Sequence, residues 1–288
     1  MATTYNNLFL DMRRQFREAG VFDPTRAARE LISTGSGKTK EELVRDSRLY
    51  VPPEVEHEIE TLARRHLAGE PVAYLIGEWE FYGLPLDISR AVLIPRPDTE
   101  VLTERAIEAA AGYQEPRVLD LCAGSGCIGL AIASKTPAAR VLLAEYDEEA
   151  IKICRQNIRR NSLGGRVSVV RADAREKPSR QLGEFDLIVS NPPYIPTGDI
   201  ASLDVSVRDY EPHLALDGGA DGLDFYRAIC EKWREALRPY GKLLFEVGIG
   251  QADTVLRMMR TNGFGDVQII PDLNGIPRVV YGTRWDEV

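Results

Sequence analysis

The residues best suited to chemistry are four consecutive ones, Asn191-Pro192-Pro193-Tyr194, which follow the apolar run Phe185–Val189. Two prolines in succession cannot continue a sheet, because each lacks the N–H that the ladder needs and each fixes φ. We therefore expect a stiff loop with unpaired backbone carbonyls, beside the side-chain carbonyl of Asn191 and the ring of Tyr194. A loop rich in acceptors and poor in donors suits a planar –NH₂ group. A methyltransferase acting on an amide or an exocyclic amine must hold such a group.

A second candidate site follows the strand expected at Arg117–Leu121. The segment Cys122-Ala123-Gly124-Ser125-Gly126-Cys127-Ile128-Gly129 leads into an apolar helix, so its glycines fit G-x-G-x-x-G in a strand–turn–helix context. Glycines let the backbone approach a ligand closely, and the N-terminus of a helix favours a carboxylate or a phosphate. The motif alone fits NAD, FAD or S-adenosylmethionine.

Acidic residues at the ends of the expected strands extend this second site. Glu145 lies about 20 residues further on, where an acid binds the ribose hydroxyls of NAD or S-adenosylmethionine. Asp173 either accepts from an adenine amino group or is an ordinary turn aspartate, and Ala174 would line the adenine pocket. We expect Asp120 both to fix the glycine loop and to lie near the methionine end of the donor. Asp147 is interpreted as a helix N-cap.

Alternating strands and helices from about residue 95 onward must position these side chains. A parallel sheet covered on both faces is expected, with strands at Arg117–Leu121, Arg140–Ala144, Val167–Arg171, Phe185–Ser190 and Lys242–Val247. Val267–Ile270 and Arg278–Gly282 are separated only by a turn, so they must pair antiparallel. The predicted fold is α/β, a Rossmann-like class I methyltransferase sheet with an antiparallel C-terminal hairpin. This hairpin and the acceptor loop together favour S-adenosylmethionine as the cofactor.

The N-terminal part of the chain has a different pattern. Residues 1–72 contain four short amphipathic helical stretches, with an N-cap and a following proline at Asp23-Pro24 and a capping box from Thr39 to Glu42. A small helical bundle is predicted. Residues 73–94 predict a β-hairpin that turns near Tyr82-Gly83 and links the bundle to the methyltransferase domain, residues 95–288.

Composition excludes several classes of function. The 288 residues carry a formal net charge of -8, which argues against a broad phosphate-binding face but leaves a local basic patch possible. No signal-peptide segment and no run of ~20 apolar residues is present, so the expected location is the cytoplasm and no membrane partner is expected. The four cysteines and three histidines lack metal-ligand spacing, so neither a metal site nor a Ser/His or Cys/His nucleophile is expected.

These residues together resemble the HemK-type protein-glutamine methyltransferases, which methylate the side-chain amide of a glutamine. The resemblance covers essentially the whole chain. Besides the bundle, the glycine loop and Asn191–Tyr194, it includes Glu70–Gly77, Leu93–Glu100 and Val207–Pro212. The segment Pro95–Glu100 is similar to the release-factor branch of the family rather than the branch acting on a large-subunit ribosomal protein.

The resemblance implies a substrate, namely the glutamine of the Gly-Gly-Gln loop in class I peptide-chain release factors. The protein would then act in translation termination, with the bundle as a substrate-recognition domain and no direct nucleic-acid partner. By position, Cys122–Gly126, Glu145, Ala174 and Asn191 would contact the donor, and Asn191–Tyr194 would hold the glutamine. The chain departs from the family at Glu145, where many relatives have Asp, and at Cys122, where Gly is common. The longer acid should still reach the ribose, and the Cys122 side chain must point away from the donor.

For the transfer itself we expect alignment and electrostatics to dominate, since no general base is evident. The Asn191 side-chain oxygen and the Pro192 carbonyl would accept the two amide hydrogens, and Tyr194 would pack on the amide. These three are the predicted catalytic residues, and Pro193 completes the predicted substrate-binding set. Arg96 and Thr99 lie near the donor or substrate, or else belong to a helix entry capped by Asp98.

Two other classes of function remain open from the residues alone. An adenine amino methyltransferase on DNA or RNA would use the same loop, but it predicts a basic groove and a target-recognition insertion, and the sequence shows neither. A non-catalytic nucleotide-binding module would use the glycine loop, but it does not explain the acceptor loop.

Overall fold

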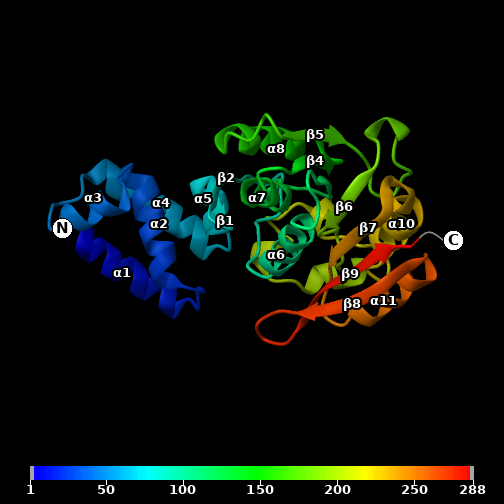
Figure 1. Ribbon diagram of the computed structural model, residues 1–288. Helices are drawn as coiled ribbons and strands as arrows, with labels where there is room; N and C mark the ends of the chain where they lie inside the picture. The colour runs from blue at the N-terminus through cyan, green and yellow to red at the C-terminus, as the bar shows by residue number, and fades with distance from the viewer. Residues whose placement is uncertain (1–2, 286–288) are drawn as a thin grey trace. The chain divides into compact units, whose positions relative to one another are not determined.

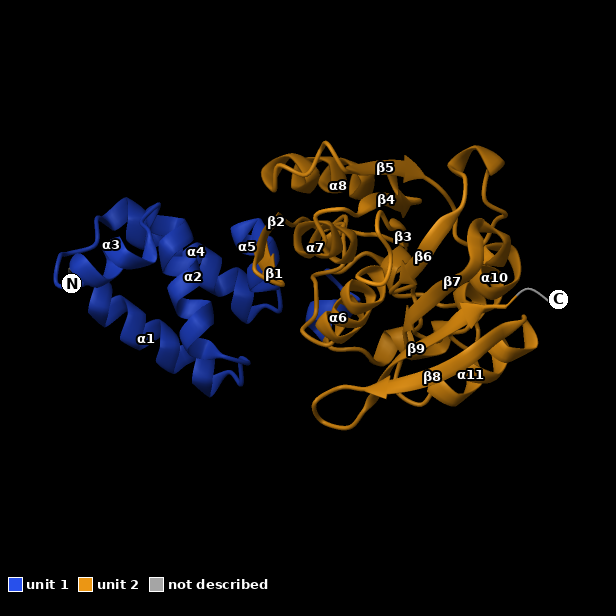
Figure 2. Ribbon diagram, viewed as in Figure 1, with its two compact units in different colours: residues 1–78, 205–210 blue, residues 79–204, 211–288 orange. Residues whose placement is uncertain are grey.

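The computed structural model describes residues 3–285 and divides the chain into two compact units (Figure 2). Unit 1 comprises residues 1–78 with 205–210, and unit 2 comprises residues 79–204 with 211–288. The chain therefore leaves unit 2 after the acceptor loop, contributes six residues to unit 1 and returns. The boundaries at residues 72 and 94, and the roles assigned to the domains, stay predictions.

Unit 1 is helical. Its helices are α1 (Tyr5–Glu18), α2 (Pro24–Ser36), α3 (Lys40–Arg45), α4 (Pro53–Leu67), α5 (Val72–Ile76) and α9 (Val205–Arg208). The start signals read from the sequence are confirmed: the Asp23 side chain accepts from Arg26 N at 3.0 Å, and Thr39 and Glu42 form a reciprocal capping box. Phe16, Leu31 and Ile59 are fully buried in the core between these helices.

The segment after the bundle begins differently from the expectation. Val72–Ile76 forms the short helix α5, which ends at Gly77 with a φ of 76°, so only the later residues form a hairpin. Its strands are β1 (Glu78–Phe81) and β2 (Leu84–Asp87), and they turn at Tyr82 and Gly83, which both have positive φ. A five-residue helix carries too short a pattern to be separated from a strand by periodicity.

Unit 2 is built on one seven-stranded sheet in the order β5-β4-β3-β6-β7-β9-β8 (Figure 1). The first five strands of that order are parallel, and β9 pairs antiparallel with both β7 and β8. The strands are β3 (Arg117–Leu121), β4 (Arg140–Glu145), β5 (Val167–Arg171), β6 (Phe185–Ser190), β7 (Leu237–Glu246), β8 (Phe264–Pro271) and β9 (Pro277–Arg284). The predicted α/β fold with its antiparallel hairpin is confirmed.

Apolar strands and helices fix this sheet in the core of unit 2. All six residues of β6 are buried, as are the central strand residues Leu119 and Leu243, which is why these strands have continuous hydrophobic runs. The helices are α6 (Thr99–Ala110), α7 (Cys127–Lys135), α8 (Glu148–Arg160), α10 (Asp224–Lys232) and α11 (Ala252–Thr261), with short 3₁₀ segments at Arg180–Leu182, Thr197–Ser202, His213–Ala215 and Arg234–Ala236. The helix expected over Gly222–Leu237 is thus shorter, and its last turn is 3₁₀.

The helices and the cysteines were each compared with what a membrane span or a disulfide requires. Within residues 3–285, no helix combines the length and the apolar character that crossing a membrane requires. The four cysteines are free thiols.

Candidate active site

The glycine loop joins β3 to α7 at the edge where the parallel strands end. Gly124 and Gly126 have φ values of 56° and 82°, and a Cβ at Gly126 would lie 2.8 Å from Leu143 Cδ1. Gly124 has no heavy atom within 4 Å of such a Cβ, so its α-carbon faces open space. Cys122 also has a positive φ, 64°, which explains why a glycine is favoured there. The loop thus offers bare backbone and the positive end of α7 to a ligand.

Asp120 supports this loop from beneath. Its side chain is fully buried, and its Oδ2 accepts a hydrogen bond from Gly129 N at 2.8 Å. A Cβ at Gly129 would lie 3.0 Å from that oxygen, so the third glycine of the motif permits the contact. Burial raises the pKa of Asp120 to about 7, although the Gly129 N–H opposes the rise. Asp120 does not line the adjacent cavity. Of the two roles predicted for Asp120, fixing the glycine loop is therefore supported by a contact, and proximity to the donor stays a prediction.

Glu145 closes the loop from the end of β4. Its carboxylate accepts hydrogen bonds from Gly124 N at 2.8 Å, Tyr146 N at 2.7 Å and Asp147 N at 3.0 Å. A carboxylate has about four lone-pair sites, which leaves capacity for a ribose hydroxyl. Asp147 is the N-cap of α8, as predicted, and accepts from Glu149 N and Ala150 N at 2.9 Å.

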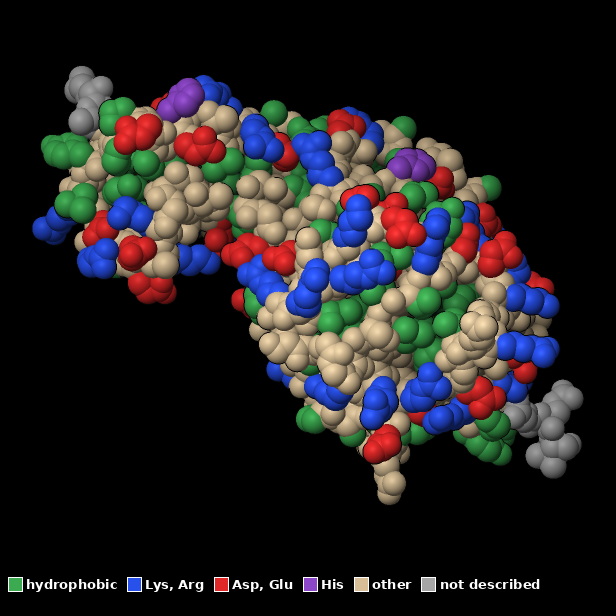
Figure 3. All heavy atoms as spheres, turned by 90° about the horizontal axis from the view of Figure 1, so that it is seen from above, with side chains coloured by type: hydrophobic (Ala, Val, Ile, Leu, Met, Phe, Trp, Pro, Cys, Tyr) green, Lys and Arg blue, Asp and Glu red, His purple; other side chains and the backbone are tan. Residues whose placement is uncertain are grey.

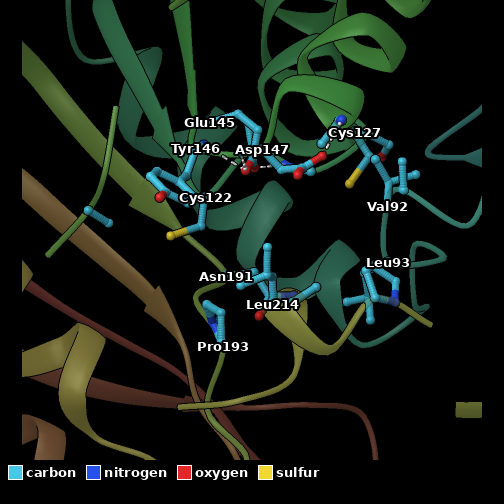
Figure 4. A pocket seen from close by; sticks show the side chains of 18 of the residues that line it. Val92, Leu93, Cys122, Cys127, Glu145, Tyr146, Asp147, Asn191, Pro193 and Leu214 are labelled. Carbon is cyan, nitrogen blue, oxygen red and sulfur yellow. Dashed lines mark hydrogen bonds between the residues drawn. The ribbon is translucent and has the colours of Figure 1, made fainter. Parts of the chain in front are cut away.

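A cavity of about 360 Å³ opens over these residues, entirely within unit 2. In Figure 4, Glu145 and Asn191 lie on opposite sides of it, and Cys122 lies between them on the wall. The structure brings most of the predicted site residues to this cavity: Cys122, Ala123, Gly124, Ser125, Glu145, Asp173, Ala174, Asn191 and Pro193. Asp120, Gly126, Pro192 and Tyr194 are not among the residues that line it. The direction of the Cys122 thiol relative to a donor stays a prediction.

The end of the cavity expected to hold adenine is formed by the residues after β5. Asp173 accepts from Arg175 N at 2.8 Å and pairs with the Arg175 guanidinium, which lowers the pKa of the Asp173 carboxyl. The Arg175 guanidinium lies 5.4 Å from the ring centre of Phe225, which also lines the cavity. Asp173 is therefore both the turn aspartate and a wall residue, and its contact with adenine stays a prediction.

The acceptor loop is held more firmly than the sequence suggests. Tyr194 O accepts from Gln251 Nε2 at 2.9 Å, and Ile195 O accepts from Gly218 N at 2.8 Å. The expectation that all carbonyls of the loop are unpaired is therefore wrong for its last part. No hydrogen bond from any group in residues 3–285 reaches the carbonyls of Pro192 and Pro193. These two remain the available backbone acceptors.

Asn191 projects from the end of β6 with its amide partly engaged. Its Nδ2 donates to Thr99 Oγ1 at 3.3 Å, which leaves the side-chain oxygen to accept. Tyr194 packs behind the loop against the hydrophobic core of unit 2, and burial raises the pKa of its hydroxyl to about 12, so the ring is neutral. The loop thus presents acceptors toward the cavity and an uncharged aromatic support behind them.

The segment before α6 forms another part of the wall. Arg96 and Thr99 both line the cavity, and Arg96 is paired with the buried carboxylate of Glu211. Burial raises the pKa of Glu211, and the Arg96 charge opposes the rise. Asp98 occupies the N-cap position of α6, as interpreted, but its side chain makes no capping hydrogen bond and pairs with Arg278 at 2.7 Å instead. Because Asp98 and Arg278 lie 180 residues apart in the chain, no local sequence pattern predicts this ion pair.

Several residues that line the cavity were not predicted from the sequence. Arg90–Leu93, Tyr146, Leu214 and Phe225 all line it, and they come from irregular segments between the motifs. Tyr146 directly follows Glu145, so adjacency to the motif was the one available signal. Glu246, buried at the end of β7 close to Asn191, was also missed.

The side chains at this site restrict the kinds of reaction that it can support. Across residues 3–285, no group of three His, Cys, Asp or Glu side chains has the placement of a metal site. Burial raises the pKa of Cys127, on the cavity wall, to about 12, so this thiol is not a nucleophile at neutral pH. The glycine loop and Glu145 have the features that suit a nucleoside, and Asn191 has those that suit a planar amine, so holding these groups stays a prediction for this site. S-Adenosylmethionine fits these features: bare backbone at Gly124, a helix N-terminus for its carboxylate and an acid for its ribose.

Figure 3 shows Lys and Arg side chains interspersed with Asp and Glu side chains over unit 2, so the face in view has no continuous basic area.

Comparisons with known proteins cover both units. Residues 7–77 match the PrmC N-terminal domain, and residues 98–206 match the methyltransferase small domain. A release factor glutamine methyltransferase of Geobacter sulfurreducens is 47% identical over 221 residues, covering 77% of this chain and 76% of the relative. One from Caulobacter vibrioides is 34% identical over 286 residues, covering 99% of this chain and 98% of the relative.

Solved structures resemble the fold at low identity. The hMettl16 catalytic domain in complex with an RNA hairpin of the MAT2A 3′UTR superposes with a TM-score of 0.58 at 17% identity, covering 79% of this chain and 83% of that one. A Thermus thermophilus 16S rRNA N2 G1207 methyltransferase in complex with AdoMet and guanosine gives 0.52 at 19% identity, covering 72% and 49%. At these identities the likenesses show the fold alone.

Proposed function

The chain belongs to the release factor glutamine methyltransferase family, and on that premise we propose that it transfers a methyl group from S-adenosylmethionine to the side-chain amide nitrogen of a release-factor glutamine. The identity of 47% to one family member and the nearly full-length match to another support the assignment. The observation that carries it in the structure is the position of Asn191, across the cavity from Glu145, with its NH₂ bonded to Thr99.

The donor site is assigned to the glycine loop and its neighbours. The backbone of Cys122–Gly126 and the N-terminus of α7 hold the methionine end, and Glu145 accepts from the ribose. Asp173 and Ala174 flank the adenine, with Phe225 beside them. When bound, S-adenosylmethionine supplies a methyl group that is already activated by a positively charged sulfur.

The substrate site is assigned to the acceptor loop. The Asn191 side-chain oxygen and the Pro192 carbonyl accept the two hydrogens of the glutamine amide, which orients the nitrogen toward the methyl and stabilises positive charge that develops on it. Pro193 and Tyr194 keep the loop rigid, since Tyr194 is anchored by Gln251 and by the core. No general base is required of this chain, because attack of the amide nitrogen on the methyl gives a cationic N-methyl amide, which is strongly acidic and can lose one N–H proton to water.

The substrate is further assigned as the Gly-Gly-Gln loop of class I peptide-chain release factors, which act in the cytoplasm on the ribosome. Unit 1 is assigned to binding the release factor away from the reacting glutamine. Direct nucleic-acid binding is not part of this assignment; the two RNA- or rRNA-modifying neighbours share only the fold.

Mass spectrometry tests this function directly. Purified class I release factor, incubated with this protein and labelled donor, should gain one methyl group on the glutamine of Gly-Gly-Gln. A variant release factor with that glutamine replaced is the matched control and should gain none. An unmodified release factor, together with methylated adenine in a parallel nucleic-acid incubation, would contradict the proposal.

A further inference from the structure

Two buried polar side chains, Thr99 and Glu246, lie close to the partly buried Asn191 at the start of the acceptor loop. Asn191 follows β6, Glu246 ends β7 and Thr99 begins α6. The parallel register of β6 and β7 pairs Ser190 with Phe245, so Asn191 and Glu246 are the next residues along neighbouring strands. Glu246 and Thr99 are each only 2% exposed.

One hydrogen bond joins two of these side chains, because Asn191 Nδ2 donates to Thr99 Oγ1 at 3.3 Å. Both side chains favour the charged form of the Glu246 carboxyl, since each can turn a hydrogen-bond donor toward it. Glu246 Oε2 is buried and has no hydrogen-bond partner within residues 3–285, so a donor turned toward it would satisfy this oxygen.

An ionised carboxylate restricts what its neighbours can present to it. It only accepts hydrogen bonds, so an amide beside it must turn its NH₂ toward it and its oxygen away. Asn191 lines the cavity, so an amide whose NH₂ is turned to Thr99 Oγ1 leaves its oxygen available to accept from a ligand there. A protonated carboxyl could instead donate to the amide oxygen and allow the opposite orientation.

We propose that Glu246, together with Thr99, is a positioning residue that fixes the Asn191 amide with its oxygen facing the substrate. This inference rests on the proposed function, and it adds a residue that neither motif contains. Glu246 contacts no reacting atom; it acts through Asn191.

The proposal implies a dependence on pH. Burial raises the pKa of Glu246 to about 7, so the carboxyl changes charge near neutral pH. Tyr226 also donates to the Glu246 backbone carbonyl at 2.9 Å, which holds the strand end in place. The titratable or charged side chains that face Glu246 from the surrounding elements are Arg278 on β9, Asp98 before α6, Tyr194 after β6, Tyr226 on α10 and Cys127 on α7. Arg278 favours the charged form of Glu246 and Asp98 disfavours it.

The kinetic test uses the full-length protein, saturating donor and release factor in single-turnover methyl transfer. The wild-type rate should rise as pH passes through about 7, because the ionised carboxylate enforces the productive orientation. E246Q should lose this rise and fall by on the order of tenfold to a hundredfold above pH 7, while its donor affinity by calorimetry changes less than about threefold. E235Q, which removes a charge from an exposed site of the same unit, should keep the wild-type profile.

A second pair of variants separates positioning from packing. T99S keeps the hydroxyl and should retain most of the wild-type rate. T99V keeps the shape but removes the hydroxyl, and its rate should fall toward that of E246Q with little change in donor affinity. Equal rates for T99V and T99S, or a wild-type pH profile in E246Q, would overturn the inference.

Nuclear magnetic resonance provides a readout that does not depend on activity. The side-chain NH₂ signals of Asn191, identified by their loss in N191A, should titrate with a midpoint near pH 7 in the wild type and not in E246Q. Their failure to titrate in the wild type would overturn the coupling whether or not the release factor is methylated. A normal titration without methylation of the release factor would support the coupling and contradict the proposed function.

Discussion

The side-chain Nδ2 of Asn191 donates a hydrogen bond to Oγ1 of Thr99 at 3.3 Å, although 92 residues separate the two in the chain. The contact joins the end of β6 to the start of α6 and leaves the amide oxygen of Asn191 as an acceptor at the cavity. The predictions below follow from this arrangement and from the elements that support it.

Replacing Asn191 with Ala should lower the methyl-transfer rate by about 10²–10³-fold, the usual loss when one preorganised polar group at a reacting centre is removed. Donor binding should remain mostly intact, because the glycine loop and Glu145 carry it. Single-turnover transfer and calorimetric titration of the donor measure the two effects separately. A variant with near-normal turnover would remove Asn191 from the account.

Replacing Glu145 with Gln should weaken donor binding by about tenfold or more, as expected when a charged hydrogen-bond acceptor is lost. The rate at saturating donor should change less, since Glu145 lies across the cavity from Asn191. E148Q is the control, because Glu148 is exposed and pairs with Arg171 on the surface. Equal donor affinities for E145Q and E148Q would contradict the role given to Glu145.

Two glycine substitutions test how the acceptor loop is held. Gly222 and Gly250 have φ values of 74° and 83°, so Ala costs roughly 1 kcal/mol of backbone strain at either position. A Cβ at Gly222 would lie 2.3 Å from Tyr194 O, whereas one at Gly250 meets nothing within 4 Å. G222A should therefore reduce the transfer rate by up to about 10²-fold by displacing the loop, and G250A should not. Similar rates in both variants would show that the loop does not need this support.

Stability should depend on pH through the buried carboxyl of Glu246. Burial raises its pKa from 4.5 to about 7, so between these values the folded state holds a proton that the unfolded state has released. The free energy of unfolding should thus fall as pH rises through this window, by roughly 3 kcal/mol at most, and level off above it. Urea unfolding at about pH 5 and about pH 8 should show a smaller difference for E246Q than for the wild type or E235Q. An unchanged difference in E246Q would mean that Glu246 does not titrate in this window.

The sequence predicted β3, β4, β5 and β6 almost residue by residue, because buried parallel strands are short apolar runs that end at chemically distinctive residues. In contrast, β7, β8 and β9 begin earlier than expected. Arg117–Leu121 and Phe185–Ser190 have the bounds that were expected. The turn at Asn274-Gly275 similarly fixed the antiparallel pairing of β8 and β9. The insertion of β9 between β7 and β8 could not be read, since strand order depends on packing between distant segments.

The candidate site was predictable where it lies on motifs and unpredictable where it depends on distant contacts. Cys122–Ser125, Glu145 and Asn191 meet at one cavity, as their places at the ends of parallel strands indicated. The partners of Asp98 and Asn191 lie far away in the chain, at Arg278 and Thr99, and no local pattern encodes them. In the sequence, nothing distinguishes Glu246 from other acidic residues at the ends of strands. Its position next to Asn191 follows only from the register of β6 and β7.

A crystal structure with S-adenosylhomocysteine and a glutamine-containing peptide from a release factor tests the central idea most directly. The account predicts that Asn191 Oδ1 and the Pro192 carbonyl lie about 3 Å from the glutamine amide nitrogen, with that nitrogen directed at the sulfur. A complex in which the Asn191–Tyr194 loop faces solvent, away from the sulfur, would contradict it.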